Sequence, residues 1–322
     1  MPLISEQNSH LKIVNPGINT QVQDSGRIGY LFSGVAPAGF MEPRAAYTAN
    51  RLCGNPIGLP LLEIPMGNFS CIVQANSTIS VTGAEATLEI NGNIRHCWQS
   101  VQVQEGDELS ISATRKGTWV YLGIRGGFKV KPVLGSCATN QREKLGGLDG
   151  KGSPLKRGDT IPCFSSEQQV AMSAQHIGAQ YFDDETHILR LIPGAQYAQL
   201  SKIQRRVLFQ TGFTLSRDFN RMGYRLDTST KVLTQLPKIT PDAIAYGAVQ
   251  IPPSGKPIIL LNDRQSLGGY CKPGSVISPD CHRLLQSPPG TKVRFALIRP
   301  SIAQQLVKDY WANIQKLPIL PM

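Results

Sequence analysis

The segment from residue 16 to residue 30 contains the first set of side chains that could bind an anion. Glycines lie on both sides of Arg27, and Asp24 stands three residues before it. Glycine lets the backbone approach a ligand closely, and an arginine there can hold a carboxylate or phosphate by two parallel hydrogen bonds. The same spacing also suits a hairpin tied by an Asp24–Arg27 pair. The segment therefore predicts either an anion site, with Gln23 as a substrate contact, or a structural turn.

A single carboxylate interrupts an apolar, strand-like run at Glu63. A carboxylate in such surroundings needs a partner or a shifted pKa, because burial of an uncompensated charge is costly. Glu63 could pair with Arg27 for structure, or act as an acid or base in catalysis. The residue types alone leave both interpretations open.

A second arginine motif covers residues 218–226, where Arg221 precedes Met222 and Gly223. The glycine and the following apolar residues indicate an arginine held at the entry of a strand. Such an arginine could bind a carboxylate or phosphoryl group, and a surface ion pair is the alternative.

The longest motif covers residues 247–270 and joins two apolar strands through a turn rich in proline and glycine. The second strand opens into a polar segment followed by a glycine pair. Polar groups beside glycine backbone, at the point where a strand leaves the core, are typical of a binding site. The candidates in this segment are Gln250, Asp263, Gln265, Ser266, Gly268, Gly269 and Tyr270.

Several classes of site are not predicted by this sequence. It contains no Walker A loop, GxGxxG fingerprint, GxSxG elbow or HExxH motif, and none of the seven cysteines forms a CxxC pair. We therefore expect no metal site and a reducing compartment. The formal net charge is +11, but the basic residues are scattered, which disfavours nucleic-acid binding. No leader or long apolar stretch is seen, so a cytoplasmic protein without a membrane span is expected.

The elements that must position these motifs are mainly short strands with glycine or asparagine between them, which favours antiparallel β structure. One helix is predicted over Glu42–Cys53, with proline in its first turn. Residues 131–162 are predicted to form a long loop. The second half should begin with a strand at residues 187–192, and further helices are expected at about 195–207, 279–286 and 301–316. The predicted organisation is a β domain at 1–165, a linker at 166–186, a second β domain at 187–300 and a C-terminal helical segment at 301–322.

Taken in order, these motifs resemble the KipA/allophanate hydrolase subunit 2 family of biotin-dependent carboxyltransferases. The family pattern runs approximately PGxxTxVQDxGRxGY, NxLxGN, LGS, RMGYRL and GxxQxPxxGxPIxLxxDxQxxGGY. It closes with an aspartate, here Asp280, and PGxxVRF, here residues 289–295. The resemblance extends over residues 11–298, and its specificity comes from the order of the motifs.

The resemblance implies two β-barrel-like domains, the C-terminal one cyclophilin-like. It further implies that the chain is the C subunit of an ATP-dependent 5-oxoprolinase. Together with a KipI-like B subunit and an A subunit, the chain would open 5-oxoproline to L-glutamate. ATP would be a co-substrate of the complex. The alternatives are carboxyl transfer from carboxybiotin to urea or another amide, and a non-catalytic regulator that binds a KipI-like kinase inhibitor.

Under the leading interpretation, Arg27 and Arg221 hold the anionic group of the substrate. Asp24, Glu63 or Asp263 supplies the acid or base. The chain departs from the family pattern at three positions, where it has Glu42, Asn220 and Ser153 in place of the usual aspartate, aspartate and arginine.

Overall fold

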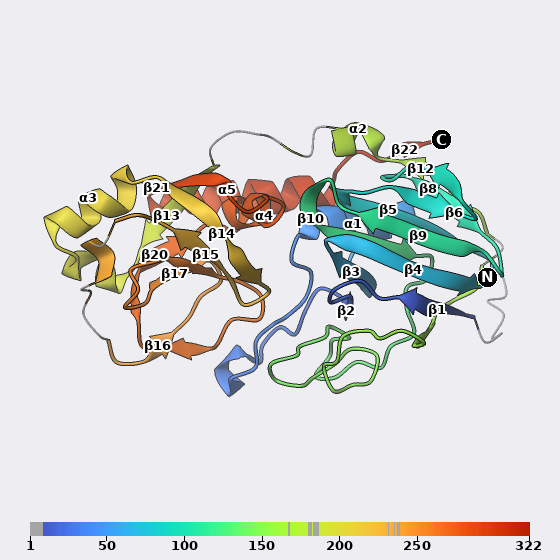
Figure 1. Cartoon of the computed structure of the whole chain (residues 1–322), viewed down its shortest axis with the longest axis horizontal. Coiled ribbons are helices and arrows are strands. Elements are labelled where there is room, and N and C mark those ends of the chain that lie inside the picture. Colours follow the sequence, from blue (N-terminus) through green and yellow to red (C-terminus); the bar gives the residue numbers. More distant parts are fainter. Residues whose placement is uncertain are drawn as a thin grey trace. The chain divides into compact units, whose positions relative to one another are not determined.

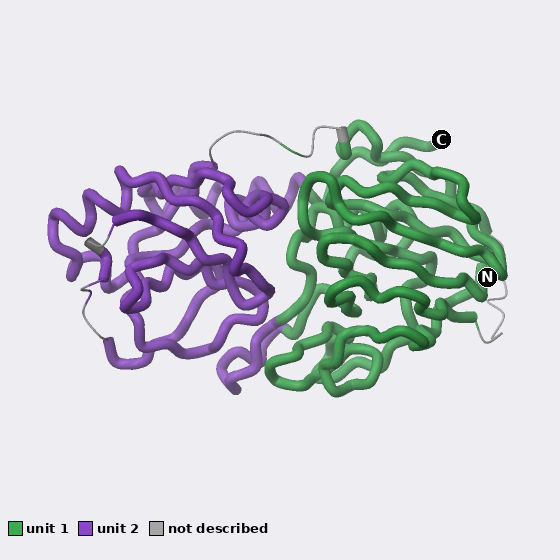
Figure 2. The backbone as a smooth tube through the Cα atoms, viewed as in Figure 1, with its two compact units in different colours: residues 1–27, 38–183, 314–322 green, residues 28–37, 184–313 purple. Residues whose placement is uncertain are grey.

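The computed structural model describes residues 9–166, 168–179, 182, 187–230, 232–234, 236 and 239–322. The chain divides into two compact units (Figure 2). Unit 1 contains residues 1–27, 38–183 and 314–322, and unit 2 contains residues 28–37 and 184–313. Each unit is considered by itself below.

Unit 1 is built from two antiparallel sheets that share one apolar core (Figure 1). The six-stranded sheet has the order β11 (Thr160–Pro162), β1 (His10–Asn15), β4 (Gly67–Gln74), β9 (Glu108–Ala113), β6 (Leu88–Ile90) and β7 (Asn93–Arg95). The five-stranded sheet has the order β2 (Gln21–Gln23), β3 (Leu61–Pro65), β10 (Lys116–Ile124), β5 (Ser77–Glu85) and β8 (Ser100–Val103). In β4 every second residue is buried, as expected for a strand with one face on a core.

Helix α1 (Pro43–Leu52) confirms the predicted helix and lies against β5 and β10 of the five-stranded sheet (Figure 1). The Glu42 side chain caps its first turn. On β5, the Ser80 and Thr82 hydroxyls donate to helix carbonyls. These contacts explain why β5 is buried on both faces and carries polar residues without the usual alternation.

The predicted loop at residues 131–162 is ordered by isolated bridges between Val133 and Ser136 and between Asn140 and Leu145. The segment at 166–186, predicted to be a linker, contains β12 (Met172–Ser173) and α2 (Gln175–Ala179) in unit 1. β12 pairs with β22 (Leu320–Pro321). Residues 167, 180, 181 and 183–186 of that segment lie outside the described residues.

Unit 2 contains a closed seven-stranded barrel. Its strands are β13 (His187–Pro193), β20 (Cys271–Val276), β17 (Ala248–Ile251), β18 (Ile258–Leu260), β15 (Gly223–Asp227), β14 (Phe213–Asn220) and β21 (Lys292–Leu297). Only the closing pair, β13 with β21, is parallel. A two-stranded ribbon of β16 (Asp242–Ala243) and β19 (Leu267–Gly268) lies outside the barrel sheet.

The expectation of a mainly β protein is confirmed. The closed barrel belongs to unit 2, whereas the strands of unit 1 form the two large sheets and the β12–β22 pair. Helices α4 (Ser278–Leu285) and α5 (Pro300–Gln315) lie where helices were predicted. The prediction of a single helix from about 195 to 207 is wrong. The structure has two elements there, η2 (Ala195–Gln199) and α3 (Lys202–Gln210), because Ser201 begins α3 with a capping box.

The remaining short 3-10 turns are η1 (Leu31–Ser33) and η3 (Val232–Thr234). Among the helices of the described residues, none is both long and apolar enough to cross a membrane.

Candidate functional site

Asp24, a predicted acid or base, is buried in unit 1 and bonded to the framework around it. One carboxylate oxygen accepts from the Gly26 N–H at 2.8 Å and from the Ser136 hydroxyl at 2.6 Å. The other accepts from the Cys137 N–H at 2.6 Å. Asp24 therefore fastens its own turn to the long loop.

Arg27, predicted to hold an anion, is 1% exposed and donates to backbone carbonyls of the same loop. Its Nε bonds the Val133 carbonyl at 3.0 Å, and its Nη2 bonds the carbonyls of Ser136 and Ala138 at 3.3 and 2.5 Å. A β-carbon built on Gly146 would lie 2.1 Å from Nη2, so this position requires glycine. The guanidinium is thus enclosed by the chain.

Gln23 uses both ends of its amide within unit 1. Its Nε2 donates to Gln21 Oε1 and to the Thr139 carbonyl, both at 2.9 Å, and its Oε1 accepts from the Gly39 N–H at 3.0 Å. These bonds fix three separate segments together, which is a structural role.

Glu63 lies in a buried polar network on β3. Its Oε2 accepts from the Met41 N–H and from the Tyr121 hydroxyl, both at 2.8 Å. The hydroxyl in turn accepts from the Glu42 N–H at 2.8 Å. Burial, together with the nearby carboxylates of Glu63 and Glu42, raises the pKa of Tyr121 well above its ordinary value. The buried Glu63 carboxylate is therefore paired with two neutral donors, a tyrosine hydroxyl and a backbone amide.

Two of the departures from the family pattern have clear structural roles. The Glu42 carboxylate accepts from the N–H groups of Arg44 and Ala45, both at 2.9 Å, and burial raises its pKa to about 7. Asn220 Oδ1 accepts from the Met222 N–H at 2.9 Å in the turn between β14 and β15. An aspartate could make the same turn contact, so asparagine preserves the local structure.

In unit 2, Arg221 and Asp263 form a buried ion pair. Arg221 Nε bonds Asp263 Oδ2 at 2.8 Å, and Nη2 bonds Oδ1 at 3.0 Å. The two residues also pair through the backbone, because the Asp263 N–H donates to the Arg221 carbonyl at 3.0 Å. The pair holds the β14–β15 turn against the segment that follows β18.

Gln250 on β17 is 3% exposed, and its Oε1 accepts from Gln265 Nε2 at 3.3 Å. Its own Nε2 is buried and has no hydrogen-bond partner among the described residues. A buried donor without an acceptor costs about 1–3 kcal/mol, so an unmet donor of this kind needs an explanation. Gln250 Nε2 is one of two such atoms among the predicted site residues. The other, Arg27 Nη1, belongs to a guanidinium that already donates to three loop carbonyls from its other nitrogens.

Gly268 on the β16–β19 ribbon lies directly against this amide. A β-carbon built at Gly268 would approach Gln250 Nε2 to 2.6 Å and Ile244 Cδ1 to 2.7 Å. Neighbouring Gly269 has more room, because its nearest neighbour would be 3.5 Å away. The first glycine of the pair therefore leaves the space beside the Gln250 donor open.

Ser266 and Tyr270, the other candidates of this motif, lie on either side of β19 in the chain. The Ser266 carbonyl accepts from the Ile244 N–H at 2.9 Å, and Ser266 is partly exposed. Tyr270 is 47% exposed. The structure thus places the Gln250–Gln265 amide pair beside Gly268 of the ribbon.

Two residues that the sequence analysis did not select also hold this ribbon. Lys272 is buried on β20, and its Nζ donates to the Ala243 carbonyl at 3.0 Å and to Asp242 Oδ2 at 3.3 Å. Arg264 donates from Nε to the Ile244 carbonyl at 3.0 Å, and burial lowers its pKa. The available signal was a lysine inside a strand, two residues after Tyr270 of the Gly-Gly-Tyr motif.

The thiols do not form a reactive centre in the described part of the chain. Burial raises the pKa of Cys53, Cys71 and Cys163 to about 12, which disfavours the nucleophilic thiolate. No group of three or more His, Cys, Asp and Glu side chains suited to a metal ion occurs among the described residues.

Comparison with known proteins places these motifs in a family. The family described as "Carboxyltransferase domain, subdomain A and B" matches residues 33–297. The C subunit of the Escherichia coli 5-oxoprolinase is 32% identical over 88% of this chain and 90% of its own length. The protein of the same name in Haemophilus influenzae is 30% identical with the same coverage.

Larger proteins contain a related region. The urea amidolyase of Saccharomyces cerevisiae is 27% identical over 95% of this chain, which spans 18% of that protein. The crystal structure of the K. lactis urea amidolyase superimposes with a TM-score of 0.85 and 25% identity, over 98% of this chain and 20% of that one. The chain therefore belongs to the carboxyltransferase domain family, subdomains A and B.

Proposed function

We propose that this chain acts as the C subunit of an ATP-dependent 5-oxoprolinase and helps to bind and activate 5-oxoproline for ring opening to L-glutamate. The proposal is supported by the two bacterial relatives that are named as this 5-oxoprolinase component and match this chain over nearly their whole length. A KipI-like B subunit and an A subunit would be its partners, and ATP would be used by the complex.

The observation that carries the proposal is the unused amide donor of Gln250. 5-Oxoproline has a lactam carbonyl and a carboxylate, and both are hydrogen-bond acceptors. A buried N–H that lacks an acceptor gains more from such a group than an exposed donor, which has already bonded water. We assign Gln250 Nε2 as the donor to an acceptor oxygen of the substrate.

The neighbouring residues then act through Gln250. Gln265 holds the other end of the amide, and Gly268 keeps the space beside the donor clear. Arg221 and Asp263 position the segment that leads to Gln265. In unit 1, Asp24, Arg27, Glu63 and Gln23 serve the framework.

The test is glutamate release in a purified mixture of the three subunits with ATP and 5-oxoproline. We expect release to require this chain and to fall strongly with Gln250→Leu. Full release without the chain would overturn its assignment to the enzyme complex, whereas full release with Gln250→Leu would overturn only the role of that amide.

A second function is favoured by the family description and by the similarity to urea amidolyase. In that case the chain would transfer a carboxyl group from carboxybiotin, delivered by a separate carrier, to urea or another amide. The Gln250 donor would then face the amide carbonyl. Carboxylation of urea by this chain with a carboxybiotinylated carrier, and no glutamate release in the three-subunit mixture, would favour this function over the first.

A further inference from the structure

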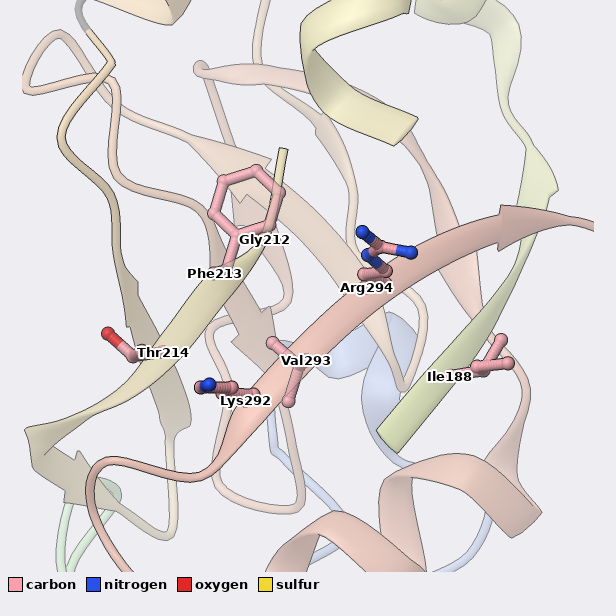
Figure 3. Close-up of a pocket in the computed structure, with 7 residues that line it drawn as sticks. All are labelled: Ile188, Gly212, Phe213, Thr214, Lys292, Val293 and Arg294. Atoms are coloured by element: carbon pink, nitrogen blue, oxygen red, sulfur yellow. The ribbon is translucent and has the colours of Figure 1, made fainter. Parts of the chain in front are cut away.

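The outer face of the unit 2 barrel carries a hollow that includes part of the closing PGxxVRF motif and that the function proposed above does not use. Its volume is about 560 Å³. Figure 3 shows that its lining comes from the starts of β13, β14 and β21, with Lys292 and Arg294 projecting from the same strand. The lining residues are Ile188, Gly212, Phe213, Thr214, Lys292, Val293 and Arg294. Pockets of this size accommodate small organic molecules.

Strand alternation places the two cations of β21 on the outside. Val293 and Phe295 are buried in the barrel, so Lys292 and Arg294 point outward. The strand register sets Thr214 beside Lys292 and Ile188 beside Arg294. The hollow therefore presents two positive charges and a hydroxyl beside one apolar side chain.

The charges of this hollow are not neutralised by the described part of the chain. None of the lining residues is acidic, and neither the Lys292 nor the Arg294 side chain has a hydrogen bond or ion pair among the described residues. Asp227 lies opposite Thr214 on β15, but its carboxylate bonds Lys256 Nζ at 2.8 Å. The nearby carboxylate is thus occupied by another lysine.

Gly212 keeps the hollow open at the start of β14. A β-carbon built there would find no atom within 4 Å, and the residue does not have the positive φ that would strain a larger side chain. A side chain at this position would project into unfilled space. Gly212 thus offers a way to change the hollow without changing the cations.

We propose that this hollow is a binding site for a compact dianion, such as a phosphate group or a small dicarboxylate. Arginine and lysine with an adjacent hydroxyl are the groups that recognise such anions in proteins. The site is independent of the function proposed for Gln250, because it shares no residue with that cluster.

The test is isothermal titration calorimetry of the full chain with inorganic phosphate, and separately with succinate, at constant ionic strength set by chloride. We expect saturable binding of at least one of these dianions, weakened about tenfold or more by Arg294→Gln and by Lys292→Gln. Gly212→Val should abolish binding although it retains both charges. Arg217→Gln is the matched control, because Arg217 is an exposed arginine of β14 outside the hollow.

The preferred anion distinguishes a phosphate site from a dicarboxylate site. Circular dichroism of each variant would verify the fold, and the two surface substitutions keep the test valid if Gly212→Val fails to fold. Absence of saturable binding by both anions would overturn the proposal. So would equal weakening by Arg217→Gln, or wild-type affinity in the Lys292 and Arg294 variants.

Discussion

The motif clusters of the two units contain the same kinds of side chain but use them differently. In unit 1, Asp24, Arg27 and Gln23 bond the surrounding segments with most of their polar atoms, although Arg27 Nη1 is buried without a hydrogen-bond partner among the described residues. In unit 2, the Arg221–Asp263 pair is likewise internal, but Gln250, from the same motif as Asp263, keeps a buried donor without an acceptor. Each cluster thus contains a buried nitrogen without an acceptor, but Arg27 donates to three loop carbonyls from its other nitrogens, whereas Nε2 is the only donor group of the Gln250 side chain. Residue types alone therefore do not separate a framework cluster from a candidate site; the use that the fold makes of each donor does.

The largest expected effect concerns the structural part of the unit 2 cluster. Asp263→Ala should lower the free energy of unfolding by roughly 3–5 kcal/mol, because it leaves the buried Arg221 guanidinium without its counter-charge. Chemical denaturation measures this loss. Replacing both partners, as in Arg221→Met with Asp263→Leu, should restore most of the stability. A loss below about 1 kcal/mol for the single variant would show that the pair does not hold this segment.

In unit 1, Arg27→Met should lower the free energy of unfolding by roughly 3 kcal/mol, since three buried carbonyls lose their donor. Arg217→Met, at an exposed position, should change it by less than about 0.5 kcal/mol. Chemical denaturation of both variants sharpens the comparison. If Arg27→Met were as stable as wild type yet inactive in glutamate release, Arg27 would be an anion-binding residue and the comparison would fail.

The Glu42 carboxyl gives unit 1 a pH dependence. Burial raises its pKa from 4.5 to about 7, so the folded state binds this proton more tightly than the unfolded state. The resulting stability is complete below pH 4.5 and is lost as the pH rises through 7, by roughly 3 kcal/mol in total. Denaturation between pH 5 and 8 should show this fall for wild type and a flatter profile for Glu42→Gln. If the stability of wild type and of Glu42→Gln changed with pH in the same way, Glu42 would not be the group responsible for this pH dependence.

Gly268→Ala tests the space beside the Gln250 donor. The added β-carbon would lie 2.6 Å from Nε2, so we expect a loss of about 1–3 kcal/mol in stability and a loss of glutamate release. Gly269→Ala is the matched control and should be milder, because its nearest neighbour is 3.5 Å away. Equal effects of the two substitutions on stability and glutamate release would show that the close approach of Gly268 to the Gln250 amide is not the cause of the loss.

Much of the fold could be predicted from local patterns in the sequence. The proline of the first turn marked α1, and helices were also expected where α4 and α5 lie. The division between η2 and α3 was missed because Ser201 caps a new helix inside an apparently continuous helical pattern. The closed barrel depends on long-range strand pairing, and the long loop is fastened by bonds to Gln23, Asp24 and Arg27, more than 100 positions away. Local spacing reveals neither.

The candidate site was predicted only in part. The order of the motifs indicated Gln250 and the glycine pair, but it gave Arg27 and Asp24 the same weight as the unit 2 residues. We assign Arg27 and Asp24 to the framework because they bond the loop at residues 133–138, more than 100 positions away in the chain. Lys272 was missed for the same reason, because its partner Asp242 lies on the ribbon.

The most direct test of the Gln250 assignment is Gln250→Leu, measured for both folding and activity. Leucine has nearly the same size and removes the unused donor, so the free energy of unfolding should change by no more than about 1 kcal/mol. Glutamate release by the three-subunit mixture should fall about 10- to 100-fold, as expected for a lost hydrogen bond to an acceptor of the substrate. Unchanged activity, or a loss of activity that merely follows a loss of folding, would contradict the assignment of Gln250 as the site's donor.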